Sequence, residues 1–143
     1  MNPKLDDVYI FQLERTIRAI KRYKKVKMKD TGLDVTSDQW VLIKRISEVP
    51  GINQKALAEA SFKDPASVAR ILDLLEKKGL IERHAVENNR REYSLHLTTE
   101  GENLVHKMLP IAIDIRAQGV KGIAQEDMDK LKEILQKIHN NFE

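Results

Sequence analysis

Apolar residues recur every three to four positions along most of this chain, and this spacing predicts amphipathic helices. The first stretch runs from about Leu5 to Met28, and Gly32 would end it. A second helix is expected to begin at Thr36, because Thr36 and Gln39 have the spacing of a capping box. It would end at Pro50-Gly51. The apolar face expected for this second helix comprises Trp40, Val41, Ile43, Ile46 and Val49.

The middle of the chain has the pattern of two short helices followed by a β-hairpin. Residues 53–60 are expected to form a short helix capped by Asn53. The next helix would begin at Asp64-Pro65, because the Asp carboxylate can accept free backbone N–H groups and Pro lacks a donor that would have no partner. Alternating residues after Gly79 then predict strands of about 81–86 and 92–97. This order of elements is that of a winged helix-turn-helix.

Two further helices are expected in the C-terminal part. A capping box of Thr99 and Glu102 would open the first, and Pro110 within its apolar pattern should bend this helix rather than end it. Gly119 and Gly122 bracket a turn before the last helix. The first and last helices carry long apolar stripes with no internal partner of equal length, so we expect them to pair with a second copy. The residues expected in this dimer interface are Leu5, Val8, Leu131, Leu135 and Ile138.

The whole pattern predicts a mainly α-helical fold with a minor β part, a winged helix-turn-helix with N- and C-terminal dimerisation helices. At 143 residues the chain is expected to form a single domain, residues 1–143. Residues of about 35–98 would form the winged DNA-binding lobe. Residues of about 1–30 and 102–143 would form the dimerisation helices.

The net charge of +3 is small, but the charges are unevenly distributed. Residues 1–30 contain nine Lys or Arg and four Asp or Glu, a net charge of +5. The net charge is −1 over residues 31–60, +1 over residues 61–95 and −2 over residues 96–143. The cations between positions 18 and 29 form either a solvated helix face or a flank that contacts DNA phosphates without sequence preference. These cations are Arg18, Lys21, Arg22, Lys24, Lys25, Lys27 and Lys29.

Several classes of site are not expected. The absence of cysteine excludes disulfides, thiolate metal sites and thiol-based redox sensing. The histidines are isolated from one another, so we expect no metal site and no other cofactor. Motifs of a nucleophile elbow or a phosphate-binding Gly loop are missing, so we do not expect an enzyme. No apolar run approaches the roughly 20 residues of a membrane span, and the N-terminus lacks a signal-peptide core. We therefore expect a cytoplasmic protein with no membrane partner. The histidines are His84, His96, His106 and His139.

Three segments carry a resemblance to a known family. They are residues 64–83, which begin Asp64-Pro65-Ala66-Ser67, then Asn89-Arg90-Arg91 in the hairpin, and Leu97-Thr98-Thr99-Glu100-Gly101. With these motifs the chain resembles the multiple-antibiotic-resistance regulator (MarR) family of winged-helix repressors. The motifs cover about a third of the chain, and the helix order covers nearly all of it. The chain departs from the family's wing motif at Asn89, which replaces an Asp and offers no charge pairing to orient the wing arginine.

The resemblance implies a role for each matching position. Residues 64–70 would enter the major groove of DNA, with Arg70 on a phosphate or a base. Residues 53–55 would hold backbone phosphates, and the wing arginine, Arg91 with Arg90 beside it, would insert into the minor groove. The residues expected to contact DNA are Asn53, Gln54, Lys55, Lys63, Pro65, Ala66, Ser67, Arg70, Arg90 and Arg91.

Two of these assignments have an alternative that the sequence leaves open. Arg70 could instead be a surface arginine paired with Asp73 or Asp64. Arg90 and Arg91 could be part of an ordinary solvated turn.

The expected function is that of a homodimeric, sequence-specific DNA-binding transcriptional regulator, a repressor released by a small ligand. Its expected partners are a palindromic operator in double-stranded DNA, a second copy of the chain and a small aromatic or apolar effector. The alternative function is a winged-helix protein-interaction module that does not read DNA. By resemblance the effector would bind between the dimer helices and the winged lobe, although apolar residues at these positions also suit an ordinary core. The candidate effector residues are Tyr9, Leu13, Trp40, Ile43, Met108 and Ile111.

Overall fold

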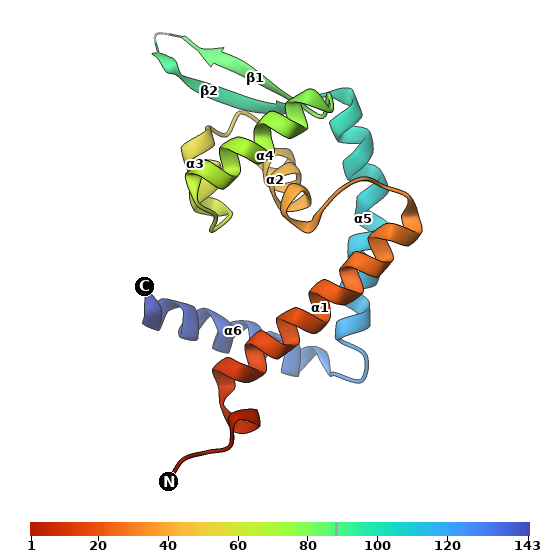
Figure 1. Cartoon of the computed structure of the whole chain (residues 1–143), viewed down its shortest axis with the longest axis vertical. Helices are drawn as coiled ribbons and strands as arrows, with labels where there is room; N and C mark the ends of the chain where they lie inside the picture. Colours follow the sequence, from red (N-terminus) through yellow and green to blue (C-terminus); the bar gives the residue numbers. More distant parts are fainter. Residues whose placement is uncertain (88) are drawn as a thin grey trace.

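Helices make up most of the protein, and two strands form a small antiparallel sheet in the middle of the sequence (Figure 1). The computed structural model describes residues 1–87 and 89–143, and the side chains of residues 89–91 lie outside the description. The elements are η1 (Leu5–Asp7), α1 (Tyr9–Thr31), α2 (Ser37–Glu48), α3 (Gln54–Ala60), α4 (Pro65–Lys77), β1 (Ile81–Val86), β2 (Asn89–Leu97), α5 (Thr99–Gly119) and α6 (Gln125–Phe142). The predicted fold class, a mainly helical winged helix-turn-helix, is confirmed.

The elements fall into two groups. Helices α2, α3 and α4 and the hairpin form a lobe, and α5 leads from this lobe toward α1 and α6 (Figure 1). Helix α1 packs against α5. The chain therefore holds its helix-turn-helix, α3 and α4, in one part and its terminal helices in another.

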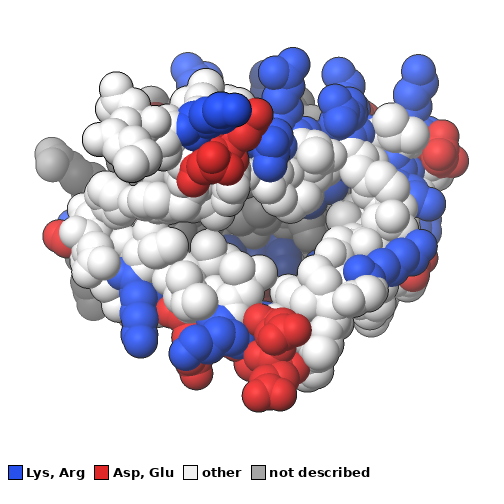
Figure 2. Space-filling model, turned by 90° about the horizontal axis from the view of Figure 1, so that it is seen from below, with Lys and Arg blue, Asp and Glu red and all other residues white. Residues whose placement is uncertain are grey.

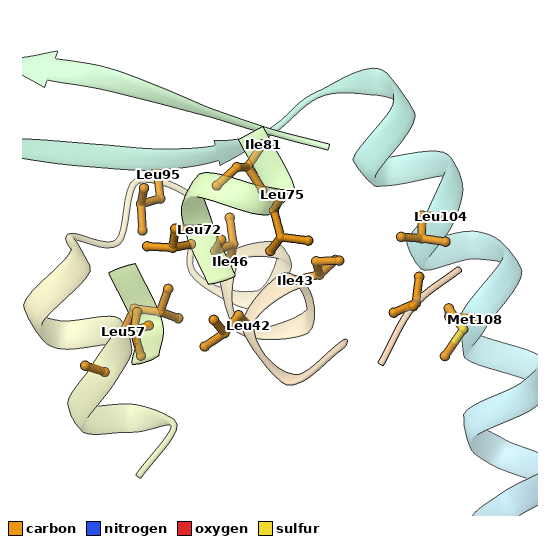
Figure 3. Packing of buried hydrophobic residues seen from close by; sticks show 13 residues of the cluster. Leu42, Ile43, Ile46, Leu57, Leu72, Leu75, Ile81, Leu95, Leu104 and Met108 are labelled. Carbon is orange, nitrogen blue, oxygen red and sulfur yellow. The ribbon is translucent and has the colours of Figure 1, made fainter. Parts of the chain in front are cut away.

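The hydrophobic core lies within the lobe and between the lobe and α5 (Figure 3). In α2 the buried residues follow helical spacing at Gln39, Leu42, Ile43 and Ile46. The expected face of this helix was wrong in part, because Val41 and Val49 are exposed and Leu42 is fully buried. The core is completed from α3, α4, the strands and α5 by Leu57, Ala58, Val68, Leu72, Leu75, Ile81, Leu95, Leu104 and Met108.

Side chains cap the helices of the lobe. The capping box of Thr36 and Gln39 forms as predicted, with the Gln39 backbone N–H donating to Thr36 Oγ1 over 3.1 Å and Thr36 N–H donating to Gln39 Oε1 over 3.2 Å. The prediction for α5 was wrong by one residue. Thr98 is its N-cap and accepts from the Gly101 N–H over 3.1 Å. The Thr98 hydroxyl also donates to the Gly79 carbonyl over 2.6 Å, so the position that bonds across to the α4–β1 turn becomes the cap.

The start of α5 packs tightly against the α4–β1 turn at Gly101. A Cβ atom added at Gly101 would lie 2.1 Å from the Leu80 carbonyl oxygen and 3.3 Å from Leu97 Cβ. Because the nearest atom belongs to the backbone, it cannot rotate away as a side chain would. Glycine at this position therefore permits the contact between α5 and the turn.

The two strands pair in regular antiparallel register from Ile81 opposite Leu97 to Ala85 opposite Tyr93. The register shifts between Ala85 and Val86. Strand β2 begins at Asn89, earlier than the expected position 92. The segment before α3 also joins β2, since the Gly51 N–H donates to the Leu95 carbonyl over 2.9 Å and the Leu95 N–H donates to the Ile52 carbonyl over 3.0 Å. This pairing, which the sequence pattern did not predict, fixes the start of α3 against the hairpin.

The terminal helices bury no residue in the single chain. Helix α1 begins at Tyr9 after η1 rather than at Leu5. As expected, Gly32 ends it, and this residue adopts the left-handed conformation. Near its C-terminal end α6 reaches the lobe, where the ring of His139 lies edge-on to that of Phe62 with 5.4 Å between the centroids. Helix α5 continues past Pro110, so proline does not end it.

Candidate nucleic-acid interface

A chain of hydrogen bonds orders the N-terminal turn of α4. The Asp64 carboxylate accepts from the Ser67 backbone N–H over 2.9 Å and from the Ser67 hydroxyl over 2.6 Å. The Ser67 hydroxyl in turn accepts from Arg70 Nη2 over 3.2 Å. The sequence forms this arrangement because Asp caps the helix and Pro65 follows it without a free N–H. The arginine is thus oriented along the same side of the helix as the cap.

The same bonds act on the acidity of Asp64. The hydrogen bond from the Ser67 side chain, and after it the one from the Ser67 backbone, hold the pKa of the Asp64 carboxyl below its ordinary value. The positive charge of Arg70 lowers the pKa further. The carboxyl is therefore ionised at neutral pH, with one cation one turn behind it.

The start of α4 presents small side chains to solvent. Pro65 and Ala66 are exposed, Ser67 is half-buried, and Arg70 is exposed. The alternative pairing of Arg70 with Asp73 is wrong, because Asp73 binds Arg83 with 2.9 Å between Oδ1 and Nη1. An exposed helix end without bulk and with a cation set back by one turn has the shape that fits a major groove.

The start of α3 is fixed by Asn53. Its side-chain oxygen accepts from the Ala56 N–H over 2.7 Å, and its amide donates to Glu92 Oε1 on β2 over 2.9 Å. Both polar atoms of Asn53 thus have partners inside the protein. Gln54 is half-buried and Lys55 is exposed. Of the three, Lys55 has the side chain that points most freely to solvent.

Ion pairs join α4 and the turn before it to neighbouring elements. Lys63, one of the expected DNA contacts, instead binds Asp38 at the start of α2 with 2.6 Å between Nζ and Oδ1. A phosphate would have to compete with that carboxylate. Arg83 of β1 bonds to α4 through Asp73 and through Glu76, the latter over 3.3 Å. The sequence did not predict either bridge, because each joins residues that only the fold brings together.

The expected wing contacts are Arg90 and Arg91. Their backbone lies in β2, but their side chains lie outside the described residues, as does the side chain of Asn89. Their assignment to the minor groove stays a prediction.

A cavity of about 160 Å³ lies where α1, α2 and α5 meet. Trp40 and Met108, two of the candidate effector residues, line it. Ile43 is fully buried in the core, and Ile111 packs against the core. Tyr9 and Leu13 lie in the first turns of α1, whereas the cavity is reached by Lys24 and Met28 near its other end. Two cations that were not among the candidate effector residues, Lys24 and Arg116, also line the cavity.

The apolar residues proposed for dimerisation are accessible in the single chain. Leu5, Leu131 and Leu135 are exposed, Leu135 to 40%, and Val8 and Ile138 are half-buried. Ile134 is also exposed on α6 beside these residues.

Two further observations concern the described residues. No three His, Asp or Glu side chains among them are arranged to hold a metal ion. None of their helices combines the length and the apolar character needed to cross a membrane.

Comparisons with known proteins agree with this geometry. The model of the MarR family matches residues 35–93, which correspond to the lobe. The S. aureus MepR–DNA complex has 23% sequence identity and a TM-score of 0.85, with 94% of this chain and 98% of the other covered. AbsC from Streptomyces coelicolor, a MarR family transcriptional regulator, has 19% identity and a TM-score of 0.86, with coverage of 99% and 97%. The S. coelicolor regulator PcaV, solved with its natural ligand, has 18% identity and a TM-score of 0.83, with coverage of 100% and 99%. At these identities the solved structures show a common fold.

Proposed function

The chain carries a MarR-family winged helix-turn-helix domain, and on this premise we propose that it is a homodimeric, sequence-specific transcriptional regulator. The observation that carries the proposal is the N-terminal turn of α4. Exposed Pro65 and Ala66 stand there beside a fixed Ser67 and Arg70. Small side chains let the helix approach base edges, and Arg70 keeps donors that are not used by Ser67 for a phosphate or a guanine.

The rest of the proposed interface surrounds this turn. The Lys55 side chain at the start of α3 would bind a DNA phosphate. The main-chain N–H groups of Gln54 and Lys55 would face the phosphates of the same DNA strand. Arg90 and Arg91 would bind in the minor groove, as the resemblance implies. Lys63 would contribute once its bond to Asp38 is exchanged for a phosphate.

A dimer is proposed because the stripes on α1 and α6 are exposed in the single chain. One reading helix contacts too few base pairs for specificity, whereas two related by a two-fold axis read a palindromic operator. DNA fixes the spacing of the two half-sites at roughly 34–36 Å, so a small change in the separation of the reading helices lowers affinity.

The proposed mode is repression relieved by a small aromatic or apolar effector. The cavity beside Trp40 is lined by α1 of the proposed dimer region and by α2 of the lobe. A ligand that binds there would favour one angle between the two helices over others. A cavity of about 150 Å³ is known to accept one benzene ring, so the volume suits a single ring. Lys24 and Arg116 would favour a ligand that also carries an acidic group.

The DNA proposal is tested by selecting a preferred duplex from a random pool and measuring three variants on it and on unrelated DNA. Ser67→Arg should change which duplex is preferred, because it alters the surface facing the bases. Arg91→Ala should weaken binding to all sequences by about 1–3 kcal/mol. Lys132→Gln on α6 is the control and should leave sequence preference unchanged. If wild-type protein selects no sequence, the reading-helix assignment fails.

The effector proposal is tested through Trp40, the single tryptophan of the chain. Its fluorescence should change on titration with single-ring aromatic acids, and the same acids should lower affinity for the selected duplex. Arg116→Gln should weaken the response to the acid more than the response to the corresponding amide. A panel that changes neither fluorescence nor DNA affinity would contradict an effector site here.

The alternative, a winged-helix module that binds protein, is favoured by one observation. Residues 31–60 and 61–95 have net charges of −1 and +1, so the lobe as a whole is nearly neutral. Such a module would show neither a mobility shift with DNA nor a dependence of affinity on salt. A salt titration therefore separates the two functions.

A further inference from the structure

Five cations form a continuous stripe from the middle of α1 to its last turn. With 3.6 residues per turn, they fall within an arc of about 100° of the helix and extend over about 16 Å along its axis. All five are exposed. Lys24 and Lys27 lie outside this arc, and Lys24 instead lines the cavity. The stripe consists of Arg18, Lys21, Arg22, Lys25 and Lys29.

No carboxylate neutralises the stripe within the described residues. Ion pairs do form elsewhere on α1 and on other elements, and they join Arg15 with Asp6, Lys44 with Glu48, and Lys78 with Asp34. None of the five stripe residues lies within 4.0 Å of an acidic oxygen there. The same chain therefore pairs cations at other positions and leaves these five without an ion pair among the described residues.

The helix itself does not account for the stripe. Like charges three and four residues apart destabilise a helix, and the stripe contains several such neighbours, for example Arg18 with Arg22 and Lys21 with Lys25. The helix dipole favours cations in the last turn, which includes Lys29 but not Arg18 or Lys21. A partner with negative charge would offset the repulsion. Figure 2 shows Lys and Arg side chains standing in a row along one edge of the molecule, where a large partner can reach them.

We propose that this stripe is a second, sequence-independent surface for the phosphates of duplex DNA. The proposal rests on the DNA-binding function proposed above. The lobe that would read the bases is nearly neutral, whereas residues 1–30 have a net charge of +5. Sequence-independent affinity comes from cations that release counterions from the phosphates. The stripe supplies this charge on an element separate from α4, so it binds DNA that flanks the operator or a second duplex.

Two acidic residues in the middle of α6, Asp129 and Glu133, are a weaker fit to the stripe if they come from a second copy. Glu133 lies 3.7 Å from Lys130 Nζ, and Asp129 accepts from the Gln125 amide over 2.9 Å. These carboxylates already have partners on their own helix. Duplex DNA carries a phosphate charge at every step of its backbone, and the counterions that screen it are released on binding.

The test uses the full-length protein and a random-sequence duplex of 40 base pairs. The variant Arg18→Gln/Lys21→Gln/Lys25→Gln removes three charges from the stripe. The control Lys121→Gln/Lys132→Gln/Lys137→Gln removes three exposed lysines elsewhere and gives the same net charge. In the stripe variant the plot of log affinity against log salt should be less steep by about 0.9 for each contacting charge that is removed. In the control the steepness should be that of the wild type. The charge-conserving Lys21→Arg/Lys25→Arg should keep the wild-type slope.

Equal slopes for the stripe variant and the control would overturn the proposal. A lower mass of the stripe variant in light scattering would also overturn it, because the stripe would then bind a second copy. The variants are also mixed with vesicles of anionic lipid, and a loss of binding by the stripe variant to vesicles but not to DNA would overturn it as well. Preference for a selected operator over random DNA is measured separately and should be unchanged in the stripe variant. If wild-type protein shows no such preference, the proposed function fails while the slope on random DNA still decides the role of the stripe.

Discussion

At the residue scale, the hydroxyl of Ser67 connects the cap of α4 to the side chain of Arg70. It donates to Asp64 and accepts from Arg70. The cap itself was predictable, because Asp followed by Pro is a local signal for a helix start. The bond to Arg70 was not, since it depends on side-chain conformations that a sequence pattern does not specify. The same holds for Lys63, which the fold places beside Asp38 rather than free in solvent.

Ser67→Ala should raise the pKa of Asp64 toward its ordinary value, because it removes the largest cause of the lowered pKa. Titration of the Asp64 carboxyl carbon by NMR measures this change. Ser47→Ala, which removes a hydroxyl bonded to the Lys44 carbonyl, serves as the control. An unchanged titration of Asp64 would mean that the Ser67 hydroxyl does not bind it in solution.

The lowered pKa of Asp64 also fixes a pH dependence. Because the pKa is lower in the folded state, ionised Asp64 stabilises the protein above the unfolded value of 3.8, and this contribution is lost as the pH falls through the folded pKa. Asp64→Asn keeps a capping oxygen but cannot ionise, so its melting temperature should depend less on pH below about 4 than that of the wild type. Asp64→Ala should melt at a lower temperature than either at pH 7. If the melting temperatures of the wild type and Asp64→Asn fell equally as the pH is lowered below about 4, this account would be contradicted.

At the element scale, the fold depends on contacts between segments that are distant in the sequence. Helical spacing predicted α2 and α4 and the position of their core, but it assigned Val41 and Val49 of α2 to the wrong side. Apolar residues at the edge of the buried face fit the same spacing of three to four residues. Only the packing of the folded protein shows which of them are buried. The cap of α5 was misplaced for a similar reason, because Thr98 and Thr99 are chemically equal and the Gly79 carbonyl selects the first.

Gly101→Ala should destabilise the protein by about 1–3 kcal/mol, because the added methyl meets the Leu80 carbonyl and the helix start must shift. Chemical denaturation measures the loss. Gly119→Ala is the matched control in the same helix, and it should be neutral or stabilising by up to about 1 kcal/mol because nothing lies near its added methyl. Equal stabilities of the two variants would show that α5 does not approach the turn this closely.

At the scale of the whole molecule, the core lies in the lobe and the adjoining part of α5, whereas α1 and α6 bury no residue. The sequence predicted apolar stripes on the terminal helices without an internal partner, and their pairing with a second copy stays a prediction. The sequence could not specify the short pairing of residues 51–53 with β2 or the cavity beside Trp40, because these depend on how the elements come together. The side chains at the wing stay predictions for a different reason, because they lie outside the described residues.

Leu135→Asp should convert the proposed dimer to a monomer or unfold it, because it places an unpaired charge in an apolar interface. Light scattering with circular dichroism distinguishes the two results. Gln136→Asp, which introduces the same charge on the other side of α6, should leave the mass unchanged. A wild-type protein that is monomeric at micromolar concentration would refute the dimer.

DNA binding should not respond to thiol oxidants, because the chain contains no cysteine. Diamide at doses that switch thiol sensors should leave affinity for DNA unchanged. A gel shift before and after treatment measures this, and release of DNA by diamide would require a different kind of oxidation.

Because α6 buries no residue within its own chain, its backbone has little protection against exchange with solvent deuterium unless a second copy covers it. The amides of α2 and α4 should exchange at rates set by opening of the lobe, whatever the protein concentration. Those of α6 should exchange more slowly as the concentration rises. Deuterium uptake measured at several dilutions would thus report association through α6, with α2 and α4 as internal references and without a mutation or a dye.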